Sequence, residues 1–385
     1  MAKNDKMDGE ELIDLLRKLV SIDSVNPGLV PGAGGEGEIA RFVASWLEDR
    51  GLDVCLEEAV SGRPNVVAVA RGSGGGRSLM LNAHMDTVGA GRMKDPFRPS
   101  LRGNRLFGRG ALDTKGALAA FMMAAARAAS SGLRGDVILA AVIDEEYASA
   151  GTEALAGRWR ADAAIVGEPT GLEIVVAHKG FAWLEIETEG TAAHGSRPDL
   201  GVDAIAKMGK VLVAIDRLSE RLSRSEPHPL LGTGSIHASI IRGGQELSSY
   251  PASCQLSVER RTIPGEAAGD TEAELEAMLE EIEREDPEFY ASVRLSLARD
   301  PLEMPNKAPI VEAMARQVRE IAGREPVLSG MGGWMDSAIL AGAGIPCVVF
   351  GPAGEGLHAD VEWVEITSVR QCHEIVLATI LEFCH

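Results

Sequence analysis

The sequence predicts an α/β protein of two domains, in which a mostly parallel sheet flanked by helices is interrupted by a smaller inserted α+β domain. The chain has 385 residues, of which 45% are hydrophobic and 25% charged, and this length exceeds what one ordinary core holds. Short apolar runs alternate with helical patterns near both ends of the chain, as in parallel sheets covered on both faces. Between these parts, from about residue 179, half-exposed alternating strands predominate.

Periodicity places the elements of the first part, residues 1–178. Apolar residues at helical spacing predict helices, and short apolar runs predict strands. In chain order, the predictions are helices at 9–20 and 38–50, strands at 65–70 and 78–84, a helix at 116–130, and strands at 137–146 and 163–169. The segment RGSGGG (71–76) joins two predicted strands with no helix after it, so we expect a flexible hairpin there and not a phosphate-binding loop.

Residues 179–298 contain a complete small α+β unit. Its predicted elements are a strand at 181–190, a helix at 202–222, strands at 238–244 and 254–264, a helix at 270–285, and a strand at 292–298. This βαββαβ order is a known compact unit, and we expect it to be inserted into the first domain. The first domain then resumes over 299–385, with helices at 308–322, 335–343 and 366–384 and a strand at 345–352.

Composition excludes several classes of protein. The formal net charge of −19 disfavours nucleic acid and anionic membranes as partners, because both require basic surface. There is no apolar run long enough to span a membrane, and the N-terminus has no apolar segment of a secretory signal. The five cysteines are scattered and form no Cys-x-x-Cys pair, so we expect neither disulfides nor a zinc site built from cysteines. The same pattern predicts a cytoplasmic location.

Potential metal ligands follow four separate apolar runs. They are His84 and Asp86, Glu145 and Glu146, Glu168, and His358. In an open parallel sheet, ligands bind outside the carboxyl ends of the strands, so we expect these side chains to converge on one crevice. Asp113, in GRGALDTKG just before the Ala-rich helix, could join them.

The spacing of these residues suggests their tasks. His84 and Asp86 share one face of an extended segment, where the carboxylate can fix the tautomer of the imidazole. Of the adjacent Glu145 and Glu146, one can bind metal while the other deprotonates water. Mixed histidine and carboxylate ligands suit zinc, with cobalt or manganese possible. Asp113, in a tight Gly-flanked loop, is the candidate bridging acid between two ions.

The chain resembles the acetylornithine deacetylase / succinyl-diaminopimelate desuccinylase family of zinc amidohydrolases, which includes glutamate carboxypeptidases and aminoacylases. The similar segments occur in the family's order: NAHMDTV (82–88), GRGALDTKGALAA (108–120), DEEYASAGTEAL (144–155), GEPT (167–170), GTAAHGSRPDLGVDAI (190–205), ERRTIPGE (259–266), and 332–365, from GGWMDSAIL to HADVEWVE. The resemblance implies a zinc-peptidase-like fold and hydrolysis of the amide bond of an N-acyl-L-amino acid.

The resemblance also implies a site with two zinc ions per subunit. Its ligands would be His84 and Glu168 for one ion, Glu146 and His358 for the other, and Asp113 between them. Glu145 would act as general base and later as acid, and Asp86 would orient His84. The family further implies a cis peptide bond between Asp113 and Thr114.

The inserted unit is similar to the family's lid and dimerisation domain. The resemblance implies a homodimer formed through 179–298, in which His194 reaches the partner's active site and stabilises the oxyanion. It also implies that Arg261 binds the substrate carboxylate, with Arg260 as the rival.

Other matching positions are less specific. Asp336 and Gly333 match a loop that lines the site. Trp334 and Met335 stand where many relatives have small or polar residues, and either an apolar substrate pocket or simple packing would explain them. Glutamate at position 168 favours a deacetylase or desuccinylase over peptidases that have aspartate there.

Alternative functions remain. The main alternative activity on the same fold is that of a di- or tripeptidase or a glutamate-type carboxypeptidase. A nucleotide-dependent oxidoreductase is disfavoured, because no Gly-rich fingerprint joins a first strand to a helix. A non-catalytic binding protein is disfavoured, because every expected ligand is present.

Overall fold

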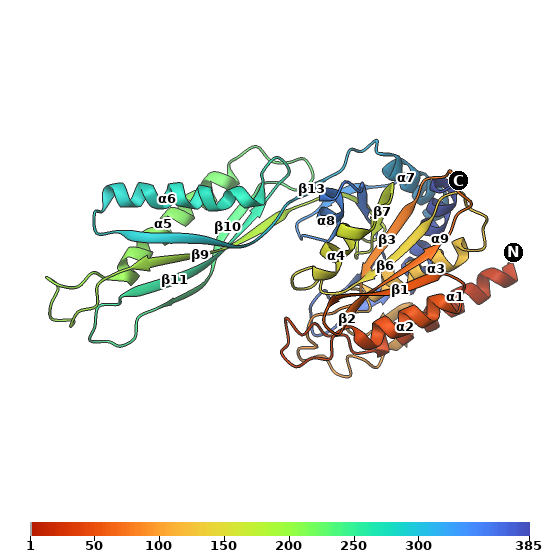
Figure 1. Cartoon of the computed structure of the whole chain (residues 1–385), viewed down its shortest axis with the longest axis horizontal. Coiled ribbons are helices and arrows are strands. Elements are labelled where there is room, and N and C mark those ends of the chain that lie inside the picture. Colours follow the sequence, from red (N-terminus) through yellow and green to blue (C-terminus); the bar gives the residue numbers. More distant parts are fainter. Residues whose placement is uncertain (1) are drawn as a thin grey trace. The chain divides into compact units, whose positions relative to one another are not determined.

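The computed structural model describes residues 2–385, with side chains from residue 9 onward. The chain divides into two compact units, whose elements are labelled in Figure 1. The first unit contains the residues up to Val176 together with Met304–Ser329 and Met335–His385, and the second contains Ala177–Glu303 and Gly330–Trp334. The predicted insertion at 179–298 therefore falls within the second unit, which also takes in a short segment near residue 332.

Helices and strands alternate through the first unit. The helices are α1 (Ala2–Ser21), α2 (Gly37–Glu48), α3 (Lys115–Ala128), α4 (Ala150–Arg158), α7 (Pro309–Ala322), α8 (Ser337–Gly342) and α9 (Ile366–Phe383). The strands are β1 (Asp53–Val60), β2 (Arg63–Ala70), β3 (Leu79–His84), β4 (Ser100–Arg102), β5 (Arg105–Phe107), β6 (Val137–Val142), β7 (Ala163–Val166), β8 (Ile174–His178, which crosses into the second unit), β14 (Leu328–Met331), β15 (Cys347–Val349), β16 (Gly354–Glu355) and β17 (Trp363–Glu365). All the predicted helices are present, whereas β1, α4 and several short strands were missed.

The main sheet has a parallel centre, which confirms the predicted fold class. The strand order is β1-β2-β6-β3-β7-β15-β8-β13, with β13 at Leu302–Glu303 and β14 paired to β8. Strands β6, β3, β7 and β15 run parallel, and antiparallel strands flank them on both sides. The short strands β16-β17-β5-β4 form a separate antiparallel sheet.

The predicted hairpin at 71–76 is wrong. Strands β2 and β3 are not neighbours, because β6 lies between them and pairs with both. Every residue of β6 is buried, so this apolar strand belongs in the middle of the sheet with a partner on each edge. The hairpin partner of β2 is instead β1, which pairs with it antiparallel through a turn at Ser61 and Gly62.

Helices cover both faces of the main sheet (Figure 1). One face packs against α1, α2, α3, α7 and α9 in a single apolar core, and the short helices α4 and α8 lie on the other. Helix α3 is buried on almost every side, which its many alanines permit because small side chains allow close packing. This central helix begins at Lys115, two residues after Asp113, so the core fixes the end of the loop that carries Asp113.

Strand β6 ends earlier than the apolar pattern predicts. The predicted strand runs to residue 146, but the chain turns after Val142, and Asp144 adopts a left-handed backbone with φ of 68°. The Asp144 carbonyl accepts hydrogen bonds from the next three N–H groups beyond Glu146, at 3.3, 3.1 and 2.6 Å. The apolar run VILAAVI does not reveal where the strand ends, because Ile143, which lies beyond the strand, is as buried as the residues within it. Glu145 and Glu146 therefore project from a tight turn.

The second unit has the predicted βαββαβ order. Its elements are β9 (Gly180–Glu189), α5 (Ala204–Ser223), β10 (Ser235–Gly243), β11 (Ser253–Thr262), a short 3-10 turn (Ala268–Asp270), α6 (Thr271–Glu285) and β12 (Tyr290–Arg299). The four strands form an antiparallel sheet in the order β10-β11-β9-β12, and α5 and α6 bury its inner face in a core of its own. No helix among the described residues is long and apolar enough to cross a membrane.

Candidate dinuclear metal centre

The predicted ligands gather at the carboxyl ends of the four parallel strands. His84 is the last residue of β3, and Glu145 and Glu146 lie in the turn after β6. Glu168 follows β7, and His358 lies beyond β15, in the loop between β16 and β17. All five belong to the first unit, and the convergence expected from strand direction is present.

Asp113 lies between the two histidines. Its Oδ1 is 3.1 Å from His84 Nε2, and its Oδ2 is 3.2 Å from His358 Nε2. Each carboxylate oxygen thus faces a different imidazole, which is the arrangement that a bridging ligand needs. The peptide bond between Asp113 and Thr114 is cis, as the resemblance implied.

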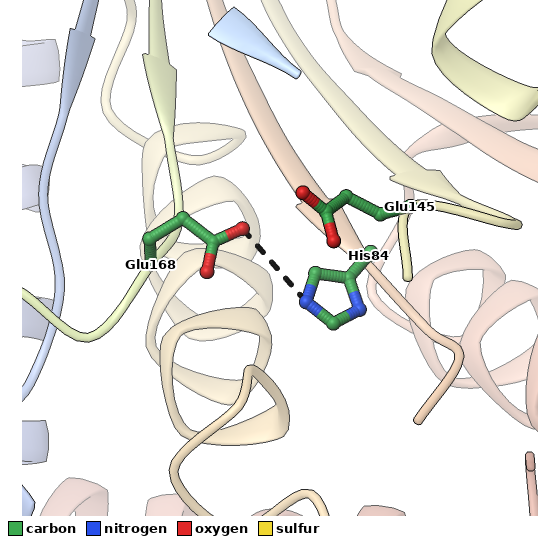
Figure 2. A group of neighbouring side chains, drawn as sticks. All are labelled: His84, Glu145 and Glu168. Atoms are coloured by element: carbon green, nitrogen blue, oxygen red, sulfur yellow. Dashed lines mark ion pairs between the residues drawn. The ribbon is translucent and has the colours of Figure 1, made fainter. Parts of the chain in front are cut away.

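Two groups of ligand atoms surround this carboxylate. In the first, atoms of His84, Glu145 and Glu168 all lie within 4.8 Å of one another, and Figure 2 shows the three side chains turned toward a common point. His84 Nε2 is 3.8 Å from Glu168 Oε1. In the second group, His84, Asp113 and Glu146 meet the same limit, and His358 Nε2 is 3.1 Å from Glu146 Oε2.

The centre holds more buried acid than its histidines can balance. Burial, followed by the charge of neighbouring acids, raises the pKa of Glu146 to about 7. Burial likewise raises the pKa of Glu145 well above its usual range, with the Glu168 carboxylate adding to the effect. Burial opposes the charge on His84, but hydrogen bonds to Asp113 and Asp86 outweigh it and raise the pKa of the imidazole. Divalent cations would supply the missing positive charge, and this nitrogen and oxygen donor set fits zinc, cobalt or manganese.

Asp86 ties His84 to the glutamate turn. Its Oδ1 lies 3.5 Å from His84 Nδ1 and accepts a hydrogen bond of 3.2 Å from the Glu145 N–H. Its Oδ2 accepts from the Glu146 N–H, also at 3.2 Å. Asp86 therefore orients the imidazole, chiefly through its main-chain oxygen at 3.0 Å from His84 Nδ1, and its fully buried carboxylate anchors the backbone of both candidate acids.

Asp86 is hydrogen-bonded to a polar network of side chains that the sequence did not predict. Asn26 Nδ2 donates to Asp86 Oδ2 at 2.7 Å and to Asp144 Oδ1 at 3.1 Å. Arg63 donates to Glu36 at 2.7 Å and to Asp144 at 2.9 Å. Asn26, Glu36 and Arg63 lie outside the matched segments, so no motif marks them. The fold assembles them into a support that holds the turn after β6.

Glu362 was also missed, and it shapes the loop that carries Asp113. Its Oε1 accepts from the N–H groups of Leu112 at 2.8 Å and Asp113 at 3.1 Å. Its Oε2 accepts from Arg109 Nη1 at 2.8 Å and the Gly110 N–H at 3.0 Å. Both charged side chains are buried, so this ion pair is part of the interior. The only local signal in HADVEW was the position of Glu362 between the apolar residues Val361 and Trp363.

Three predicted residues of the second unit differ in their surroundings. His194 is in a loop, where its Nδ1 is 2.8 Å from Ser196 Oγ. Arg260 is buried and bonds two glutamates, at 3.0 and 3.1 Å, which gives it a structural role in this unit. Arg261 keeps 30% of its side chain exposed and pairs with Glu259 at 2.7 Å. Arg261 is thus the better placed of the two arginines to meet a ligand.

The surroundings of Trp334 and Met335 favour simple packing over an apolar substrate pocket. The Trp334 ring contacts Phe181 edge-on at 5.8 Å, and its Nε1 donates to the Asp300 carbonyl at 3.1 Å. Met335 is 4% exposed. Gly333 beside them is exposed.

Asp336, which precedes the first residue of α8, is fully buried. Thr152 Oγ1 donates to its Oδ2 at 2.5 Å, and burial raises its pKa to about 6. Its charge also contributes to the raised pKa of Glu145 and Glu168. The negative charge of Asp336 therefore opposes ionisation of these two glutamates.

Comparison with known proteins agrees with this geometry. A family model described as peptidase family M20/M25/M40 matches residues 80–382. The chain is 30% identical to the acetylornithine deacetylase of Myxococcus xanthus over 387 residues, which covers 96% of each chain. It is 29% identical to the N-formyl-4-amino-5-aminomethyl-2-methylpyrimidine deformylase of Bacillus subtilis (strain 168), covering 97% of this chain and 95% of that protein.

A solved structure shares the fold. It is that of the YXEP protein of Bacillus subtilis, described as a dinuclear metal-binding peptidase from the M20 family. The TM-score is 0.74 at 18% identity, and the similarity covers 98% of this chain and 99% of that one. The two-unit architecture is therefore shared at low sequence identity.

Proposed function

The chain belongs to peptidase family M20/M25/M40, whose members are metal-dependent hydrolases of amide and peptide bonds, and from this premise we propose that it deacylates a small N-acyl-L-amino acid. The observation that carries the proposal is the position of Asp113 between His84 and His358, with 3.1 and 3.2 Å to the two imidazoles. A carboxylate so placed can bridge two cations.

We assign the ligands as follows. His84 and Glu168 would hold one cation, Glu146 and His358 would hold the other, and Asp113 would be shared between them. We propose zinc for both positions, with cobalt or manganese as possible substitutes. When bound, the cations supply Lewis-acid polarisation of the scissile carbonyl and lower the pKa of water.

The chain's own residues then move the proton and orient the centre. Glu145, which lies beside His84 and Glu168, accepts the proton of the attacking water and later gives it to the leaving amine. Asp86 keeps His84 in position throughout. We propose that His194 of a second subunit donates a hydrogen bond to the tetrahedral oxyanion and that Arg261 binds the substrate carboxylate.

A substrate screen tests the proposal. We expect N-acetyl, N-succinyl or N-formyl amino acids to be hydrolysed faster than di- or tripeptides when zinc, cobalt or manganese is added. The measurement is kcat/KM for each class on the same preparation, with the Glu145→Gln variant as the control for contaminating activity. A preference for peptides would overturn the deacylase assignment and favour a peptidase on this scaffold, as the name of the YXEP relative suggests.

We also propose a homodimer formed through the second unit. Strand β10 is at one edge of its sheet, and Ile240 and Ile241 on it are each 51% exposed. An exposed apolar edge strand can pair with another strand, and a second copy of β10 would extend the sheet. We propose a cytoplasmic location for this assembly, because the five cysteines are scattered in the sequence and form no Cys-x-x-Cys pair.

The double variant Ile240→Glu/Ile241→Glu is expected to be monomeric, because adjacent acids on the edge would repel those of a second copy. Light scattering coupled to size-exclusion chromatography measures the mass. The matched control is Tyr290→Glu on β12, the opposite edge of the sheet, where Tyr290 is 60% exposed. This control should stay dimeric. A monomeric wild-type protein, or dissociation by the control alone, would contradict the assignment of β10.

A further inference from the structure

The first unit contains a hollow of about 550 Å³ that the proposed reaction does not use. Its walls come from the loop before β4, from the β4–β5 hairpin and from the segment after His358. The lining includes Lys94, Arg98, Arg102, Phe107, Val361 and Glu362. This volume is enough to hold a small organic molecule.

The acids of the hollow are mostly neutralised by cations of their own. Asp360 accepts hydrogen bonds from the N–H and Nε of Arg92, at 2.9 and 3.1 Å. Glu362 is buried against Arg109, with 2.8 Å between Oε2 and Nη1. Asp95 is the remaining acid of the lining.

The cations of the hollow lack such partners. Among the described side chains, none forms an ion pair with Lys94, Arg98 or Arg102. Arg102 lies against the Phe107 ring, with its guanidinium carbon 5.0 Å from the ring centre. Three cations therefore face one hollow with a single unpaired acid beside them, on a chain whose formal net charge is −19. Like charges gathered in this way repel one another, and a bound anion removes that repulsion.

The walls between the cations are partly apolar. Met93, Phe107 and Val361 all line the hollow, and Val361 is 61% exposed. An apolar side chain this exposed at the rim of a charged hollow can cover the carbon frame of a ligand. The two arginines present planar donors that match the oxygens of carboxylate, phosphate or sulfonate groups.

We propose that this hollow, lined by Lys94, Arg98, Arg102, Phe107 and Val361, is a binding site for a small organic polyanion, one with two or more oxyanion groups on an apolar frame. The site is separate from the acids that form the metal centre. It adjoins that centre through Glu362, whose Oε1 accepts from the Asp113 N–H at 3.1 Å. The inference does not depend on the proposed reaction, since it rests on this hollow alone.

Calorimetric titration of the metal-loaded protein with benzene-1,3-disulfonate tests the site, because sulfonates are weak metal ligands. We expect saturable binding that weakens with added salt. The Arg98→Gln and Arg102→Gln variants should each bind about tenfold more weakly, the loss of one charge-assisted pair. Inorganic phosphate should bind more weakly than the disulfonate, because it cannot contact Phe107 and Val361.

The matched control is Arg105→Gln. Arg105 is the cross-strand partner of Arg102 on the same hairpin, but it lies outside the hollow and stacks on Trp363. This variant removes the same charge and should bind the disulfonate as the wild type does. An equal loss in Arg105→Gln, or no saturable binding by the wild type, would overturn the site. Equal affinity for phosphate would overturn the organic ligand class. Repeating the titration with Glu145→Gln separates this result from the fate of the proposed reaction.

Discussion

Replacing Glu145 by glutamine is expected to lower turnover by about 10²–10⁴-fold while leaving the metal content unchanged. Glutamine keeps the shape of the side chain, but its amide cannot accept the proton of the attacking water. Glu145 lies within 4.8 Å of ligand atoms of His84 and Glu168, so it is close enough to serve water held at the centre. Steady-state kinetics and elemental analysis of the dialysed variant measure the two quantities.

The adjacent Glu146 provides the matched control. Its carboxylate lies 3.1 Å from His358 Nε2, and we assign it as a ligand of the second cation. Glu146→Gln should therefore lose metal as well as activity, and added zinc should restore part of the turnover. The two variants differ by one residue and by the same chemical change, so opposite metal contents would separate base from ligand. Wild-type turnover in Glu145→Gln would remove Glu145 from the role of base.

The largest effect on folding is expected at Glu362. Glu362→Gln should reduce the free energy of unfolding by about 3–5 kcal/mol, because it leaves the buried guanidinium of Arg109 without a counter-charge. The new amide would also turn an N–H₂ group toward donors, since all four hydrogen bonds to this carboxylate come from N–H groups. Urea denaturation followed by circular dichroism measures the change.

Two further variants separate the buried pair from general effects of charge. Asp360→Asn removes an exposed carboxylate two residues away, and its unfolding curve should overlay that of the wild type. Arg109→Met/Glu362→Gln should be less destabilised than the sum of the single variants, because neither charge is then left buried alone. Additive losses in the double variant would show that the ion pair does not account for the effect.

Much of the candidate site could be predicted from sequence because its residues follow strongly apolar strands. His84, Glu168 and the two glutamates after residue 142 each come directly after a buried run, and strand direction alone places such residues at one edge of a parallel sheet. His358 follows the last apolar run less directly and Asp113 lies in a Gly-flanked loop, and for both the matching motifs added support to what the residues suggested. The βαββαβ order of the second unit was equally readable from alternation and helical spacing.

The sequence by itself thus determined the fold class, the order of most elements and the identity of the candidate ligands, because periodicity and strand ends are local properties. Tertiary structure alone decided that β6 separates β2 from β3, that Asp144 turns the chain before Glu145, and which side chains support the centre. The partners that connect Asn26, Arg63 and Glu362 to the surroundings of the centre lie at least 27 residues away from them in the sequence. Contacts of this kind depend on which elements pack together, and the local pattern around a residue does not record that.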